Sequence, residues 1–262
     1  CVKKFQCKRC EAMQAILYVA HGSRVKAGID EALRFIHKVK SRVAVPIQEE
    51  SFLELAEPTI LQGVAQCVQQ GATKIAVAPI LLLTANHLNQ DIPAEIAEAK
   101  KQFPHVEFTI GDAFGIDDRL VETLHQRLLE VNESLTGANV LLIGRGSSDP
   151  AVERDLVQIA NRLKQKGNLH EVATCFLYGK GVSFEQSLQR LASENRKTFI
   201  IPYLLFSGLL KQHIETKIAG VQEINQAILL CNCLGYDEQV QHVFVDRIHQ
   251  LIEKGRDIHE YT

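Results

Sequence analysis

The chain has 262 residues, of which 46% are hydrophobic and 23% charged, and its formal net charge is −2. This is the composition of an ordinary globular protein with one large or two small domains, and it excludes a generally basic nucleic-acid-binding protein. There is no Trp and only five Tyr, and no apolar run reaches the roughly 18–20 residues of a membrane-spanning helix, so neither nucleic acid nor a membrane is an expected partner.

The first twelve residues differ from the rest of the chain. They are basic, lack the apolar core of a signal peptide and precede the only methionine, Met13. We interpret 1–12 as an upstream extension or cloning remnant that is disordered. Its pair Cys7 and Cys10 indicates zinc only weakly, because no second pair accompanies it. The other cysteines fall on strand or helix patterns, as reduced thiols of a cytoplasmic protein do: Cys67, Cys175, Cys231 and Cys233.

From Met13 onward, apolar runs of strand length alternate with helical patterns. After the first run, Ile29, Leu33 and Ile36 recur at helical spacing, and Asp149 before Pro150 marks another helix start. The strands are near-continuous apolar runs, which is typical of parallel sheets covered on both faces. Eight strands are predicted, at 15–19, 47–53, 74–83, 106–110, 139–143, 171–177, 198–206 and 227–231. This alternation predicts an α/β fold with right-handed crossovers.

An internal repeat divides the chain. Four short motifs occur twice, in the same order and at nearly constant separation: Gly-Ser, Phe-Leu, Pro-x-Leu-Leu and Gly-x-Asp. Their first copies begin at 22, 52, 79 and 115, and their second copies at 146, 176, 202 and 235. We therefore predict two similar domains, each a parallel four-stranded sheet flanked by helices, at 13–135 and 136–262.

Ligands of open parallel sheets bind beyond the carboxyl ends of the strands. In the first half these ends carry His21, Glu54 and His87. The second half keeps the four repeated motifs but has other residues at these three places, namely Arg145, Tyr178 and Leu210. Residues needed only for folding should persist in both copies. The three polar residues of the first half are therefore candidates for function.

Two imidazoles and a carboxylate suit a metal ion. Neutral imidazole binds Fe, Co, Ni and Zn, and a site with few protein ligands leaves positions open for a transient metal. A histidine also takes up protons near neutral pH. A metal ligand beside a base is what metal insertion into a tetrapyrrole requires, because two pyrrole protons must leave. The plainer alternative is that each histidine is a hydrogen-bonded structural group.

Several motifs in order resemble the class II chelatases, most closely their two-domain members that act on sirohydrochlorin. The motifs are VAHGSR (19–24), ESFLELAEPTI (50–60), GATKIAVAP (71–79), LLLTANH (81–87) and LIGRGSSDP (142–150). The resemblance runs from Met13 to about Leu251. It implies that the chain is a metal chelatase that inserts Fe²⁺ into sirohydrochlorin, with one active half and one degenerate half, no tightly bound cofactor and a monomeric state.

The resemblance also implies residue roles. His21 is the catalytic histidine, a metal ligand and proton acceptor; Glu54 is the catalytic acidic residue at the metal; His87 is the second histidine ligand. The positions that contact the macrocycle are Glu57, Leu82, Leu83, Thr84, Ala85, Asn86 and His87. Sirohydrochlorin carries eight carboxylates, so basic residues near strand ends are candidates to bind them: Arg24, Arg145, Lys180 and Lys211.

Alternatives stay open at this point. Co²⁺ or Ni²⁺ could replace iron, as in cobalamin-type biosynthesis, although the chain has no His-rich tail and Cys231-x-Cys233 is not a cluster motif. A non-enzymatic carrier of metal or tetrapyrrole would use the same residues without needing a base. A phosphoryl-transfer enzyme with His21 as nucleophile would need clustered arginines around it, and only Arg24 is close in sequence.

Overall fold

The computed structural model describes residues 13–84, 86–131, 134–179, 181–194, 196–222 and 227–257. The predictions for residues 1–12 and for Ala85 and Lys180 lie outside these ranges. Within the described ranges, no helix combines the length and the apolar character that crossing a membrane demands.

The first half forms a parallel four-stranded sheet in the order β2-β1-β3-β4. Its strands are β1 (Gln14–Ala20), β2 (Ile47–Phe52), β3 (Lys74–Pro79) and β4 (Glu107–Ile110). The helices of this half are α1 (Lys26–Lys40), α2 (Ile60–Gln69), α3 (Ile92–Gln102) and α4 (Asp118–Val131), with a π-helical turn, η1 (His87–Asp91), before α3. The central strand β1 is buried along almost its whole length, as its continuous apolar sequence predicts.

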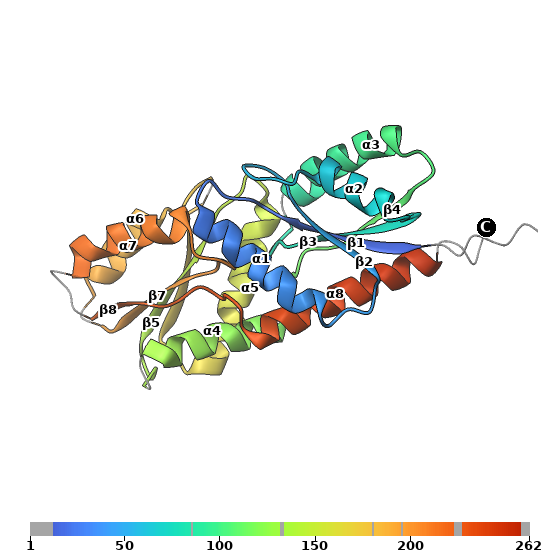
Figure 1. The fold of residues 1–262 in the computed structure, drawn as a ribbon. Helices are drawn as coiled ribbons and strands as arrows, with labels where there is room; N and C mark the ends of the chain where they lie inside the picture. Colours follow the sequence, from blue (N-terminus) through green and yellow to red (C-terminus); the bar gives the residue numbers. More distant parts are fainter. Residues whose placement is uncertain are drawn as a thin grey trace, which may run out of the picture.

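The second half repeats this plan, with the parallel order β6-β5-β7-β8. Its strands are β5 (Asn139–Gly144), β6 (Glu171–Phe176), β7 (Thr198–Pro202) and β8 (Ile228–Leu230). Its helices are α5 (Pro150–Gly167), α6 (Phe184–Ala192), α7 (Leu209–Gln222) and α8 (Glu238–Asp257). The predicted fold of two similar α/β halves is confirmed, and the two sheets lie at opposite ends of the molecule (Figure 1).

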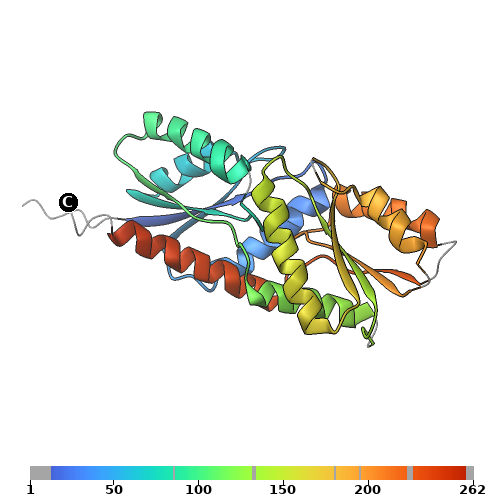
Figure 2. The same ribbon diagram turned by 180° about the vertical axis from the view of Figure 1, so that it is seen from behind.

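The last helix of each half packs on the other half. The C-terminal helix α8 runs along the first sheet and α4 lies beside the second, as both views show (Figures 1 and 2). On α8, the Phe244 ring lies 5.1 Å from the Phe114 ring, and Arg247 donates to the Phe114 carbonyl. On α4, Asp118 pairs with Arg162 of α5 at 2.7 Å. One hydrophobic core therefore runs through both halves, and the predicted boundary at 135/136 falls between α4 and β5.

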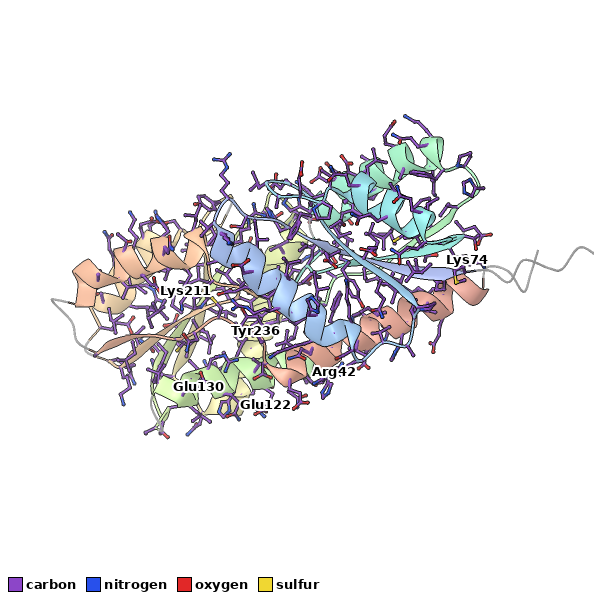
Figure 3. All side chains as sticks on the ribbon, in the orientation of Figure 1. Arg42, Lys74, Glu122, Glu130, Lys211 and Tyr236 are labelled. Atoms are coloured by element: carbon purple, nitrogen blue, oxygen red, sulfur yellow. The ribbon has the colours of Figure 1, made fainter. Side chains whose placement is uncertain are left out.

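A polar and aromatic contact joins the halves beside α1. Tyr236, which precedes α8, lies next to α1, with the Arg34 guanidinium 5.7 Å and the Lys38 ammonium 5.4 Å from its ring centre (Figure 3). Nearby, Glu31 of α1 accepts hydrogen bonds from the backbone N–H and the hydroxyl of Ser207. Contacts of this kind fix the orientation of the two sheets, because a cation over an aromatic face and a charged hydrogen bond both depend on direction.

Two strands end earlier than the sequence predicts. The apolar runs at 74–83 and 198–206 suggest long strands, but β3 ends at Pro79 and β7 at Pro202. Proline has no N–H to donate to the strand beside it. The central strand on the other side still accepts one hydrogen bond beyond each proline, from the Ile80 N–H to Val19 and from the Tyr203 N–H to Ile143, both at 2.8 Å. The apolar residues that follow each proline line a cavity between the halves instead of continuing the sheet.

Helix starts follow local capping rules in both halves. Asp149 accepts from the Ala151 N–H at 2.9 Å ahead of Pro150, as predicted. At equivalent places, Thr59 caps α2 with a reciprocal Gln62 contact and Ser183 caps α6. The Thr59 and Ser183 caps each stand at the end of the loop after the second strand of the half, so capping sets where that loop ends.

The four described cysteines are free and buried, in agreement with the prediction of reduced core thiols. Burial raises the thiol pKa of Cys67, Cys175 and Cys231 to about 12 and that of Cys233 to about 11. Thiols with such pKa values remain protonated at neutral pH, so they behave as small hydrophobic side chains.

Candidate metal centre

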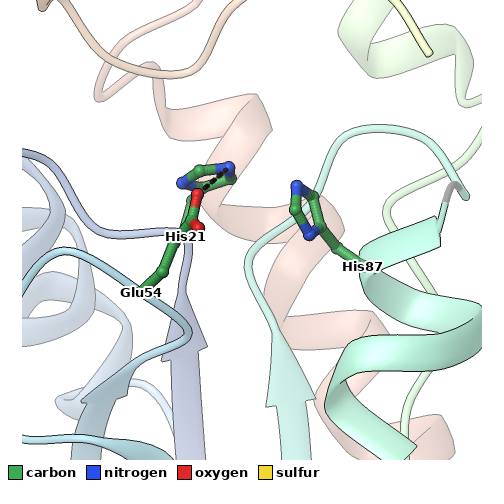
Figure 4. A group of neighbouring side chains, drawn as sticks. All are labelled: His21, Glu54 and His87. Atoms are coloured by element: carbon green, nitrogen blue, oxygen red, sulfur yellow. Dashed lines mark ion pairs between the residues drawn. The ribbon is translucent and has the colours of Figure 1, made fainter.

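The structure brings together the three polar side chains predicted for the first half. His21 follows β1, Glu54 follows β2, and His87 opens η1 beyond the end of β3 (Figure 4). One ligand atom from each residue lies within 4.8 Å of the others. They meet because β2, β1 and β3 are neighbours with their carboxyl ends at the same sheet edge.

A glycine lets two of these strand ends approach each other. Gly22 has φ +94°, and a Cβ there would lie 1.8 Å from the Glu54 carbonyl oxygen. Only glycine permits both the conformation and the approach. The loops are then joined by a hydrogen bond of 3.1 Å from the Glu54 N–H to the His21 carbonyl. This contact places the two side chains next to each other, with 3.4 Å between His21 Nε2 and Glu54 Oε1.

Both imidazoles present the same nitrogen to the site. Their ring centres are 4.8 Å apart and their planes nearly perpendicular. His21 Nδ1 lies 3.3 Å from the Gly22 carbonyl oxygen, and His87 Nδ1 lies 2.7 Å from Asp91 Oδ2. These oxygens accept hydrogen bonds, so we assign the proton of each neutral ring to Nδ1. The lone pair of each Nε2 is then available for a metal ion, with Asp91 orienting its histidine from behind.

The surroundings favour an uncharged imidazole at His21. Burial lowers the pKa of His21, electrostatic interactions with Arg145 and His87 lower it further, and Glu54 opposes the change. Because a protonated imidazole cannot ligate a metal, the lowered pKa keeps His21 in its metal-binding form at neutral pH.

Arg145 reaches this site from the second half. Its Nη1 lies 2.6 Å from His21 Nε2 and 3.0 Å from His87 Nε2. Beside it, Asn86 donates to the Ser148 hydroxyl at 3.0 Å, which joins the two halves at the same edge. The sequence predicts Arg145 as a ligand for substrate carboxylates, and the structure brings its guanidinium against the two imidazoles.

A cavity of about 900 Å³ lies between the two sheets; His21 and His87 line it, whereas Glu54 is not among the described residues of the lining. This volume is large for a small-molecule site, where volumes of about 300–1,000 Å³ are usual. Its walls include the apolar residues that follow Pro79 and Pro202. The predicted residues that line it are His21, Arg24, Leu82, Leu83, Asn86, His87 and Arg145.

Other predicted residues lie elsewhere. Glu57 is exposed in the loop before α2, and neither Glu57 nor Thr84 is among the described residues that line the cavity. Lys211, on α7, also lies outside that lining and pairs with Glu215 at 3.7 Å (Figure 3). The macrocycle contacts assigned to Glu57, Thr84 and Ala85 therefore stay predictions.

Sequence reasoning missed several residues of this site. Asp91, the partner of His87, stands four residues after it, a spacing that places both on one helical face and could have indicated the pair. Leu55, Tyr178 and Leu209 line the cavity although 48%, 58% and 54% of their surfaces are exposed. Exposed apolar side chains grouped at a cavity indicate a binding surface for an apolar or flat ligand.

Comparisons with known proteins agree with this geometry. A family model described as CbiX matches residues 15–131 and again 139–251. The sirohydrochlorin ferrochelatase of Priestia megaterium is 44% identical over 97% of this chain and 98% of its own length. A sirohydrochlorin cobaltochelatase of the same organism is 35% identical over 92% of this chain and 81% of its own length.

The fold comparison gives the same result. A solved structure of SirB from Bacillus subtilis with Fe³⁺ superposes with a TM-score of 0.86 at 42% identity, covering 93% of this chain and 97% of that one. The duplicated family match accounts for the internal repeat, and the high coverage extends the similarity over both halves. The chain belongs to the CbiX family.

Proposed function

We propose that this chain is a sirohydrochlorin ferrochelatase, which inserts Fe²⁺ into sirohydrochlorin to give siroheme and two protons. The observation that carries the proposal is that two imidazoles and one carboxylate have ligand atoms within 4.8 Å of one another, and that both histidines line a large cavity. The 44% identity to the ferrochelatase of Priestia megaterium over nearly the whole of both chains supports the same reaction.

In this mechanism Fe²⁺ is a substrate held by protein ligands on one side only. His21 and His87 bind it through Nε2, and Glu54 is the third ligand or a base. The open positions of the ion face the cavity, where the pyrrole nitrogens replace the remaining water. Two pyrrole N–H protons must leave as the four ring nitrogens bind the ion. In the role of base, Glu54, whose side chain is 45% exposed, would accept protons at the metal and return them to solvent.

The macrocycle occupies the cavity between the halves. Leu82, Leu83 and Asn86 line the wall on the metal side, and Tyr178 lines the wall of the second half. Arg24 and Arg145 are the cations available in the lining for the carboxylates of the ring. Glu57, Thr84 and Ala85 are proposed contacts of the ring periphery.

Cobalt is the second candidate metal. Imidazole and carboxylate ligands suit Co²⁺ and Ni²⁺ as well as Fe²⁺, so the three side chains do not discriminate between these ions by chemistry. The 35% identity to the cobaltochelatase of Priestia megaterium favours Co²⁺ as the alternative. The higher identity to the ferrochelatase ranks iron first.

We further propose that the protein acts as a monomer in the cytoplasm. Both walls of the cavity, and every residue assigned to the metal, come from one chain. A second copy is therefore not needed to complete the site. The buried, free cysteines fit a reducing compartment.

The test is metal insertion under anaerobic conditions. Fe²⁺ or Co²⁺ is mixed with sirohydrochlorin and the change in absorption is followed for the wild type, His21→Ala and His87→Ala. We expect each variant to lose about 100-fold or more in rate, because a metal ligand or proton acceptor is removed. His213→Ala is the matched control, since this histidine lies on α7 near Glu185, away from the cavity. Wild-type rates in both site variants would overturn the assignment.

Glu54→Gln separates an enzyme from a carrier. The amide keeps the size of the side chain but cannot accept a proton at neutral pH. An enzyme that uses Glu54 as a base still binds the metal and the tetrapyrrole but loses insertion rate. A carrier would bind both and show no insertion above the spontaneous rate even in the wild type.

A further inference from the structure

The geometry points to Arg145 as a placeholder for the metal ion: its guanidinium occupies the position between the two imidazoles until a carboxylate of the tetrapyrrole draws it away. This inference rests on the proposed function and adds a binding order to it. The ring binds first, Arg145 leaves, and the metal enters last.

The placeholder role follows from the atoms that Arg145 contacts. A single nitrogen, Nη1, lies 2.6 Å from His21 Nε2 and 3.0 Å from His87 Nε2. Each Nδ1 already has an oxygen partner, so Nε2 is the accepting atom of both rings. Arg145 thus uses the same two lone pairs that would bind Fe²⁺. A metal ion and this guanidinium cannot occupy the site together, because they need the same atoms and both are positively charged.

The position of Arg145 in the repeat explains how it reaches the imidazoles. Arg145 follows β5 as His21 follows β1. The Tyr178 N–H donates to the Arg145 carbonyl just as the Glu54 N–H donates to the His21 carbonyl, each at 3.1 Å. The two strand ends face the same cavity from opposite walls. A long side chain at the end of β5 therefore spans to the metal ligands of the first half.

Arg145 is also held weakly enough to leave. Its side chain is exposed, and among the described residues it forms no ion pair with a carboxylate. Its recorded partners are two neutral rings. A carboxylate offers a two-pronged hydrogen bond and an opposite charge, and a neutral imidazole offers neither. A ring with eight carboxylates bound in the cavity would therefore compete successfully for Arg145, and the movement would free both Nε2 atoms.

Binding of Co²⁺ alone to the full-length protein tests the placeholder directly. Titration is followed by calorimetry and by the visible spectrum of the bound ion. We expect Arg145→Ala and Arg145→Gln to bind Co²⁺ about tenfold or more tightly than the wild type. Arg154→Ala removes the same charge from the exposed face of α5, outside the cavity lining, and should stay within about twofold. If Arg145→Ala binds no more tightly than Arg154→Ala, the inference is wrong.

A second measurement tests the binding order. Wild-type protein premixed with Fe²⁺ should show no burst of insertion when sirohydrochlorin is added, because the ion is not yet held at the site. Arg145→Gln premixed with Fe²⁺ should show a burst proportional to the enzyme concentration. A wild-type burst as large as that of Arg145→Gln would overturn the order.

These results separate the inference from the proposed function. Adding His21→Ala to Arg145→Ala should abolish the gained affinity; if it does not, the ion binds elsewhere and the placeholder is wrong. If His21→Ala lowers insertion while Arg145→Ala leaves Co²⁺ affinity unchanged, the proposed function stands and only the placeholder fails. If His21→Ala leaves insertion unchanged, the proposed metal site itself fails.

Discussion

In each half, the carboxyl ends of the strands meet at one edge of the sheet. The first edge, which follows β1 and β2, and the second edge, which follows β5 and β6, share a backbone conformation but carry different side chains. A Cβ at Gly22 would lie 1.8 Å from the Glu54 carbonyl oxygen, and a Cβ at Gly146 would lie 1.8 Å from that of Tyr178. Downstream, the Gly115 N–H donates to Leu82 and the Gly235 N–H to Leu205, at 2.9 and 2.8 Å. The same few backbone contacts therefore form this edge in both halves, and the side chains at the edge can differ without changing it.

The difference teaches which residues serve the fold and which serve the reaction. The first edge carries two imidazoles and a carboxylate within 4.8 Å. The second edge has lost that set, yet it contributes Arg145 and Tyr178 to the same cavity. One edge carries the proposed metal ligands and the other carries a cation and an exposed tyrosine, so a single cavity is lined by two unequal copies.

The shared backbone predicts the largest effect on stability. Gly22→Ala and Gly146→Ala should each lower the free energy of unfolding by about 2–5 kcal/mol, because each adds a backbone clash to a left-handed conformation. Gly71→Ala is the control, since Gly71 has a similar φ of +96° but no atom within 4 Å of its Cβ position. Urea unfolding measures all three. A Gly146→Ala loss no greater than that of Gly71→Ala would show that the second edge is not built like the first.

The proposed metal ligands of the first edge predict an effect of intermediate size, on the affinity for Co²⁺. Asp91→Ala should lower Co²⁺ affinity by about 10–100-fold, because His87 loses the carboxylate that orients it at 2.7 Å. Asp112→Ala removes an exposed carboxylate that pairs with Lys254, outside the described cavity lining, and should leave the affinity unchanged. Equal affinities of Asp91→Ala and the wild type would mean that the ring is oriented by packing alone.

The Gly-x-Asp motif, which occurs in both halves, predicts the smallest effect, a change in the free energy of unfolding. Asp117 accepts from the Arg119 guanidinium at 2.9 and 2.8 Å, and this contact holds the pKa of Asp117 below its usual value of 3.8. Asp117→Asn should lower the free energy of unfolding at pH 7 by about 1–2 kcal/mol, an amount reduced by partial exposure to solvent. Asp237→Asn should cost less, since Asp237 lies 3.5 Å from its nearest recorded arginine nitrogen, on Arg127.

The pH dependence of this effect has a defined sign. A carboxylate with a lowered pKa in the folded state contributes its full stability above the unfolded pKa and loses it as the pH falls through the folded pKa. The difference between the wild type and Asp117→Asn should therefore be constant near neutrality and shrink below about pH 3.8. Unfolding curves at a series of pH values check this, and a difference that stays constant into acid would contradict it.

Local pattern was sufficient to predict most of the fold and the cluster of two histidines and a glutamate. Apolar runs located the strands, and the repeated motifs aligned the halves, so His21, Glu54 and His87 could be placed at adjacent strand ends. Local pattern also identified the Asp149 cap. The same pattern predicted β3 and β7 to be longer than they are. The apolar residues after Pro79 and Pro202 line a cavity, but their composition is that of a buried strand.

Contacts between the halves could not be predicted. Helical periodicity shows that α4 and α8 each have an apolar face, but it does not specify the sheet on which that face packs. The place of Arg145 also depends on the separation of the two sheets, which no local pattern encodes. The resemblance to the chelatases supplied residue roles, and it contained no signal that a cation of the second half would lie 2.6 Å from His21.

The exchange of α4 and α8 has a consequence for the history of the gene. Because each copy shelters the sheet of its neighbour, deleting either one would strip a helix from the survivor and leave rings such as Phe114 in water. A chain reduced to one copy would therefore need another segment, or a second molecule, to replace the missing helix. The copy that lacks the histidine pair thus serves the fold of its neighbour as well as the shared cavity.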